Sequence, residues 1–192
     1  LFGFYGYSFS NKFQLELSTG YFNYVNLVDN QHSSLNSTYL SKNNLNYKIG
    51  GKLSILSPQN HDPFWMTLRT SVGSGNHVNQ SYLITELINT FRLNDKFAFN
   101  VSPKYFFSDI DSFGAVGVAS YINLLDNLQL IPEINFPLKN DSDFVSSLGL
   151  RYSFHPGKSI DLYYSNAAGV QEIGQLLEDK RFRFGIKLNF YY

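Results

Sequence analysis

The strongest constraint on the fold is an alternation of apolar and polar residues with a period of two, which is clearest over residues 181–192. The residues between the apolar ones include Arg183 and Lys187. Successive side chains of a strand point to opposite faces, whereas a helix would scatter the apolar residues around its circumference, so the segment is predicted to be an amphipathic strand. Its apolar face comprises Phe182, Phe184, Ile186, Leu188, Phe190 and Tyr192.

The same alternation recurs along almost the whole chain and predicts an all-β protein. Most of the alternating segments are close to the 9–11 residues that a tilted membrane strand requires. Eleven strands are predicted, near residues 1–9, 12–27, 45–57, 63–73, 80–93, 96–107, 113–123, 127–137, 143–154, 159–165 and 181–192.

The connections between these strands alternate in length. Short turns are predicted at 10–11, 58–62, 94–95, 124–126 and 155–158, and the remaining links include the two longest, 28–44 and 166–180. Short turns at one end and longer loops at the other are typical of outer-membrane barrels. No linker or repeat divides the chain, so residues 1–192 are predicted to be a single barrel domain, the C-terminal part of a longer precursor because the chain starts at Leu1.

The composition excludes several classes of protein. Charged residues make up 16% of the chain, against about 25% in an average soluble domain. A formal net charge of zero argues against a nucleic-acid binder, and the absence of cysteine excludes a disulfide scaffold and thiolate zinc sites. No run approaches the roughly 18 apolar residues of a membrane helix, so any membrane crossing is made by strands.

Alternation alone also fits a soluble, lipocalin-like ligand-binding barrel, which is the first alternative. In that case the charged face is outside and the apolar residues fill the centre. About eleven strands would make this centre wide enough to require a ligand or plug. The apolar face consists mainly of Phe, Tyr and Leu, and charges lie opposite it on nearly every strand, which favours the membrane.

The terminal strand, residues 182–192, resembles the C-terminal signature of bacterial outer-membrane β-barrel proteins. The resemblance implies location in a Gram-negative-type outer membrane, contact with lipopolysaccharide, periplasmic termini, and recognition of this strand by the barrel-assembly machinery. Single-chain bacterial barrels usually have an even number of strands. We therefore expect an antiparallel up-and-down transmembrane barrel of 10–12 strands, with twelve favoured. The additional strand would lie upstream of Leu1 or at residues 35–40.

In such a barrel the polar faces point inward and carry eight basic and four acidic side chains. They could form an ion-paired filling of the interior, or line a small porin-like pore. In a pore, the excess of Lys and Arg would favour a small anionic solute. The predicted lumen-lining residues are Glu16, Lys48, Lys52, Arg69, Glu86, Arg92, Lys104, Glu133, Arg151, Asp161, Arg183 and Lys187.

Signs of enzymatic chemistry are few. The four histidines, His32, His61, His77 and His155, fall in predicted loops and share no metal-ligand spacing. No Gly-rich phosphate loop links a strand to a helix. No catalytic residue, metal or cofactor is therefore predicted.

One short string, residues 163–169, resembles the His-x-Ser-Asn-Ala-Gly stretch of the outer-membrane lipid A deacylases. The resemblance implies a nucleophile at Ser165 and an acid at Glu172 or Glu178, but Tyr163 occupies the histidine position. Tyrosine is a poor base at neutral pH. A lipid hydrolase is therefore the second alternative.

The two longest loops carry separate expectations. Loop 166–180 is expected to fold into the lumen as a constriction or to lie across the mouth of the barrel. Loop 28–44 is polar and suits contact with lipopolysaccharide sugars or simple solvation.

Overall fold

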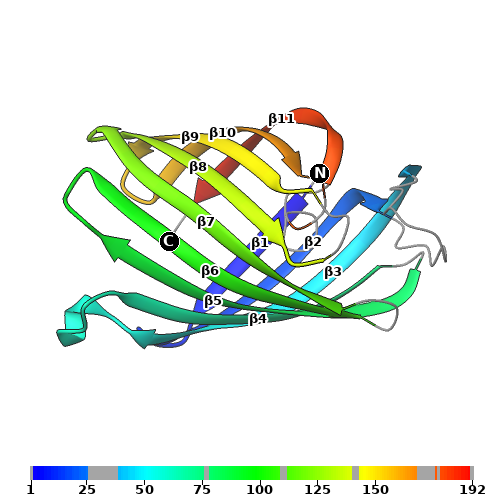
Figure 1. Cartoon of the computed structure of the whole chain (residues 1–192), viewed down its shortest axis with the longest axis horizontal. Coiled ribbons are helices and arrows are strands. Elements are labelled where there is room, and N and C mark those ends of the chain that lie inside the picture. The colour runs from blue at the N-terminus through cyan, green and yellow to red at the C-terminus, as the bar shows by residue number, and fades with distance from the viewer. Residues whose placement is uncertain are drawn as a thin grey trace.

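The computed structural model describes residues 2–25, 39–75, 78–108, 112–139, 143–167, 176 and 178–190. In these residues eleven strands form one sheet in chain order, and each strand pairs antiparallel with the next (Figure 1). The predicted all-β, up-and-down architecture is confirmed. The strands are β1 (Phe2–Ser8), β2 (Phe13–Val25), β3 (Tyr39–Leu56), β4 (Trp65–Gly75), β5 (Val78–Arg92), β6 (Phe97–Ser108), β7 (Ser112–Leu125), β8 (Leu128–Pro137), β9 (Val145–His155), β10 (Lys158–Ala167) and β11 (Glu178–Phe190).

Several strands are longer than their alternation predicts, at the end where the long loops lie. Residues 39–44, assigned above to a loop, belong to β3, where Leu40 pairs with Tyr24 and Asn44 with Phe22. Backbone pairing continues beyond the alternating segment because an antiparallel ladder needs no particular side-chain pattern. Residues 39 and 40 are therefore part of β3 rather than of a separate strand, and residues 26–38 lie outside the described part of the chain.

A similar extension shortens the loop predicted at 166–180. Ala167 ends β10 and pairs with Glu178, the first residue of β11. At the opposite end of the sheet the connections are short. One contains a single 3-10 turn, η1 (Pro58–Asn60), which ends at His61 in the left-handed conformation. As predicted, the two longest connections, 26–38 and 168–177, lie at one end of the sheet. The alternation in length is incomplete, because the connection 57–64 at the other end is longer than the connections 76–77 and 109–111.

The sheet curls around an interior (Figure 1). The side chains that face this interior are polar, and the apolar side chains lie outside. Glu16, Lys48, Ser71, Asn100 and Asn135 are buried, whereas most large hydrophobic side chains, on almost every strand, are exposed. This polarity is the reverse of a soluble barrel, whose charged face is outside. The soluble ligand-binding alternative is therefore not favoured, and the apolar outer face suits lipid.

The backbone pairing between β5 and β6 is interrupted near the middle of the two strands. Glu86 pairs with Lys104 and Asn89 with Val101, but no pairing joins the residues between them, where Pro103 lies. Proline has no N–H to donate to the neighbouring strand. The Asn89 side-chain amide donates instead to the carbonyl oxygens of Leu87 and Val101, both at 3.1 Å. A side-chain donor thus takes the place of the missing backbone donor.

Two tyrosine rings cover glycines on the inner face of the wall. A Cβ added to Gly73 would lie 2.2 Å from the Tyr82 ring, and one added to Gly185 would lie 1.9 Å from the Tyr163 ring. Each tyrosine is the cross-strand partner of its glycine. The glycines are thus required by close approach, because any larger residue would displace the ring.

Candidate functional site

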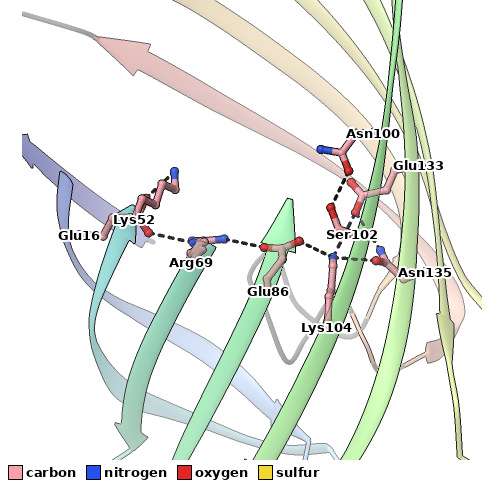
Figure 2. Close-up of polar contacts among 9 residues, drawn as sticks. All are labelled: Glu16, Lys52, Arg69, Glu86, Asn100, Ser102, Lys104, Glu133 and Asn135. Atoms are coloured by element: carbon pink, nitrogen blue, oxygen red, sulfur yellow. Dashed lines mark hydrogen bonds and ion pairs between the residues drawn. The ribbon is translucent and has the colours of Figure 1, made fainter. Parts of the chain in front are cut away.

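A row of ion pairs crosses the inner wall from β2 to β8 and is called here the charged belt (Figure 2). Glu16 lies between two cations: its Oε1 is 2.6 Å from Lys52 Nζ, and its Oε2 is 3.0 Å from Arg69 Nε. The belt continues from Arg69 to Glu86 at 3.7 Å and from Glu86 to Lys104 at 3.2 Å. Its last pair joins Lys104 to Glu133 at 3.9 Å.

The strand register explains the belt. Arg69 is directly opposite both Lys52 on β3 and Glu86 on β5, and Glu86 is directly opposite Lys104 on β6. Opposite charges in facing positions stabilise a sheet, whereas like charges destabilise it. Lys52 and Arg69 are like charges, and the Glu16 carboxylate from β2 compensates both. The Glu16 side chain is completely buried, as a paired acid in a protein interior must be.

Uncharged polar residues complete the belt at its β6–β8 end. Lys104 Nζ donates to Asn135 Oδ1 at 2.8 Å, and the Asn135 amide donates to Glu133 at 2.8 Å. A Cβ on Gly117 would approach Asn135 Oδ1 to 2.6 Å and the Lys104 side chain to about 3.0 Å. Gly117 therefore provides the space in which these groups meet. Nearby, Ser102 donates to Asn100.

The opposite part of the wall, β9–β11, carries a second set of charges. Arg151 on β9 holds Asp161 on β10 through two hydrogen bonds of 2.7 and 2.8 Å. Lys187 on β11 interacts electrostatically with Asp161, and also with Arg151, Lys52 and Arg69. Among the described residues Lys187 makes no ion pair or hydrogen bond, and it is exposed. Lys187 therefore offers its charge to whatever occupies the interior.

The predicted lumen-lining residues are placed on this inner face with one exception. Lys48 is buried and acts electrostatically on Glu16, and Arg183 lies on the same face of β11 as Lys187. Arg92 is the exception, because it ends β5 and pairs with Asp95 in the adjoining turn, with 54% of its side chain exposed. It belongs to the rim. Within the predicted set, the other seven basic and all four acidic residues give an excess of three positive charges.

Apolar residues form a second feature of the inner wall. Ile84, Phe106, Phe113 and Ala115 pack together on β5–β7, and Leu176 from the β10–β11 connection packs against them with 1% of its surface exposed. Leu176 thus contacts the inner wall. The rest of the predicted constriction, residues 168–175 and 177, lies outside the described residues.

The outer face of β11 carries the predicted assembly signal. Phe182, Phe184, Ile186, Leu188 and Phe190 are all exposed, and Tyr192 lies outside the described residues. Recognition by an assembly machinery stays a prediction. The arrangement confirms only that these side chains form one accessible apolar row.

Ser165 has its hydrogen bonds within the wall. Its hydroxyl donates to the Ser146 carbonyl oxygen at 2.8 Å and accepts from the Ala167 N–H at 3.0 Å. Tyr163, at the position of the deacylase histidine, covers Gly185 on the inner face. Glu172 lies outside the described residues, as does the side chain of Glu178.

The described residues provide no other chemistry of this kind. Within them no group of three or more His, Asp or Glu side chains could hold a metal ion. No helix in the same ranges is long and apolar enough to cross a membrane.

The predicted lumen-lining set contained only charged residues and left out the uncharged members of the interior. Asn100, Ser102 and Asn135 are buried, as are Ser159 and Asn189, whose amide donates to Ser159 at 3.1 Å. They alternate in step with the charged residues of their strands, so their side chains lie on the same face. The alternation along each strand was therefore the signal that could have identified them.

The fold is of the antiparallel up-and-down β-barrel type, with a charged inner face and an apolar outer face. One solved structure with this fold is "KdgM porin in complex with disordered oligogalacturonate", with a TM-score of 0.69 and 10% sequence identity. The similarity covers 98% of this chain and 90% of that chain, so the fold is that of a porin throughout. No protein-family model and no curated protein matches the sequence.

Proposed function

We propose that this protein is a passive channel of the bacterial outer membrane, with a mild preference for small anionic solutes. The observation that carries the proposal is a charged, partly exposed inner wall enclosed by an apolar outer face. Lipid contacts the outer face, and water and solute contact the inner one. Lipopolysaccharide and the barrel-assembly machinery are the other partners proposed for the outer face and for β11.

Anion preference rests on the unequal pairing of the interior charges. The belt acids Glu16 and Glu86 largely compensate Arg69 and Lys104, so the belt contributes little net field. Lys187 makes no ion pair among the described residues, although Asp161 lies directly opposite it on β10. KdgM porin, which shares the fold, was solved with oligogalacturonate, an anionic oligomer. A related chemistry is therefore a reasonable starting point for solute screening.

The contacts of Ser165 support a channel rather than a lipid hydrolase. A nucleophilic serine needs a base within hydrogen-bond reach. The Ser165 hydroxyl donates instead to the backbone carbonyl oxygen of Ser146.

The test is conductance and ion selectivity of the folded protein in planar bilayers. Folding is first checked by comparing unheated with boiled samples on a detergent gel, where a closed barrel migrates as a compact species only when unheated. In a KCl gradient, the reversal potential of the wild type should show anion preference. Lys187→Gln should reduce this preference, and Lys12→Gln, a lysine in the exposed β1–β2 turn, should leave it unchanged.

Two results would overturn the proposal. One is a heat-modifiable protein that inserts into the bilayer without conducting, which would indicate a closed structural barrel. The other is a cation preference that Lys187→Gln leaves unaffected.

A further inference from the structure

One part of the inner wall, formed by β11, β3 and β4 and called here the cationic side, exposes positive charge to the lumen. Lys52 and Arg69 are 33% and 20% exposed, whereas Glu16, the acid that both of them contact, is completely buried. Lys187 on β11 is exposed and interacts electrostatically with both Lys52 and Arg69, so it lies near them. Arg183 is on the same face of β11. Water and solute in the lumen therefore meet these cations, while the carboxylate that compensates two of them is covered.

Another part of the wall, formed by β5–β8 and called here the anionic side, exposes negative charge. Glu86 on β5 and Glu133 on β8 are 15% and 25% exposed, whereas Lys104, which contacts both of them, is only 7% exposed (Figure 2). Both acids interact electrostatically with Tyr121 on the inner face of β7. The exposed carboxylates therefore gather on this side, where the compensating cation is covered.

Arg151 on β9 lies between the two sides and adds little charge to either. It interacts electrostatically with Lys187 on the cationic side and with Tyr121 on the anionic side. Its two hydrogen bonds to Asp161, of 2.7 and 2.8 Å, place a carboxylate directly against its guanidinium group. The two charges of this pair largely cancel, so the cationic and anionic sides keep their opposite signs.

Charges of opposite sign on two sides of a lumen create an electric field across it. A simple ion is attracted by one side and repelled by the other, so the two effects partly cancel. A solute that carries both signs is stabilised on both sides when it is oriented along the field. For a unit charge about 7 Å away in water, the stabilisation of one group corresponds to an increase in local concentration of about 2.7-fold.

We propose that this channel admits small zwitterions, molecules that carry both a carboxylate and an ammonium group, in preference to uncharged molecules of the same size. The carboxylate of the solute is directed towards the cationic side and its ammonium group towards the anionic side. This inference rests on the channel function proposed above and narrows its solute class. The cationic side carries the larger number of charges, which agrees with a mild preference for anions among simple ions.

Swelling of vesicles that contain the folded protein tests the proposal with two isomers, alanine and lactamide. Alanine is a zwitterion and lactamide is uncharged, and their equal composition keeps the effect of size the same for both. The alanine-to-lactamide ratio of swelling rates should be about three. Equal rates, or slower entry of alanine, would overturn the zwitterion proposal and leave the channel standing. No swelling with either solute would overturn the channel function itself, and the zwitterion proposal with it.

Two substitutions separate the field from the net charge, and only variants that remain heat-modifiable are compared. Glu133→Gln removes a charge from the anionic side and Lys187→Gln removes one from the cationic side. They change the net charge in opposite directions, but both should lower the alanine-to-lactamide ratio. Asp126→Asn, in the exposed β7–β8 turn, is the matched control and should leave the ratio unchanged.

Lys187→Gln disrupts no ion pair among the described residues, so it keeps the test open if Glu133→Gln fails to fold. A ratio that the folded variants leave at the wild-type value would overturn the proposal.

Discussion

Replacing Glu86 by glutamine removes the acid that connects the two halves of the charged belt. Glu86 bridges Arg69 at 3.7 Å and Lys104 at 3.2 Å. Arg69 keeps its contact with Glu16, and Lys104 keeps Asn135 at 2.8 Å and the more distant Glu133. The fold should therefore survive. The loss of charge-assisted contacts should lower the free energy of unfolding by about 1.5–3 kcal/mol.

The larger effect should be on ion selectivity, because the substitution removes one negative charge from the inner wall. A unit charge acts on an ion about 7 Å away with about 0.6 kcal/mol in water. That energy raises the local anion concentration about 2.7-fold and lowers the cation concentration by the same factor. The anion-to-cation permeability ratio should therefore increase about sevenfold.

The assay is the reversal potential of single channels in a KCl gradient at low ionic strength. The screening length is about 30 Å at 0.01 M salt and about 10 Å at 0.1 M, so the difference between variant and wild type should shrink as salt is added. Asp95→Asn is the matched control, because Asp95 is 95% exposed in the β5–β6 turn. An unchanged reversal potential in Glu86→Gln, or one displaced towards cations, would refute the reasoning.

Two further substitutions probe the wall itself. Asn89→Leu should lower the free energy of unfolding by about 1–3 kcal/mol, although leucine is more apolar, because the Leu87 carbonyl oxygen loses its hydrogen bond. Urea titration of the folded protein measures this loss. Adding Pro103→Val, which restores a backbone N–H, should recover most of it. An additive double variant would contradict this explanation. Leu176→Ala should lower the free energy of unfolding by about 2–3 kcal/mol through lost packing against Phe106, and it should increase the single-channel current. If current and stability both equal those of the wild type, the contact contributes nothing.

The sequence was sufficient to predict the strands and their two faces, since lipid on one side and water on the other impose a period of two. It identified Glu16 and Arg69 as inward residues. It could not predict that these two would pair, because Glu16 on β2 reaches Arg69 on β4 only through the relative register of three strands. The alternation along a strand predicts which face a side chain lies on. Its position along the barrel axis depends on the register between neighbouring strands.

Position along the barrel also explains the two departures. Arg92 has the inward parity, but it ends its strand and therefore pairs at the rim. Residues 39–44 lack alternation, yet β3 includes them because backbone pairing continues where neither face needs to be apolar. Alternation predicts strands well only over the height at which one face contacts lipid.

The pairing of β6 with β7 is continuous over eleven successive residue pairs, from Phe97 with Ile122 to Phe107 with Ser112, and no bulge interrupts it. A substitution in such a strand alters one side chain, but a single-residue deletion exchanges the two faces of everything beyond it. Deleting one residue between Val101 and Lys104 would turn Lys104 towards lipid, where a lysine costs about 2–4 kcal/mol at the bilayer midplane. Related chains should therefore differ in length at their loops and keep the length of these strands constant.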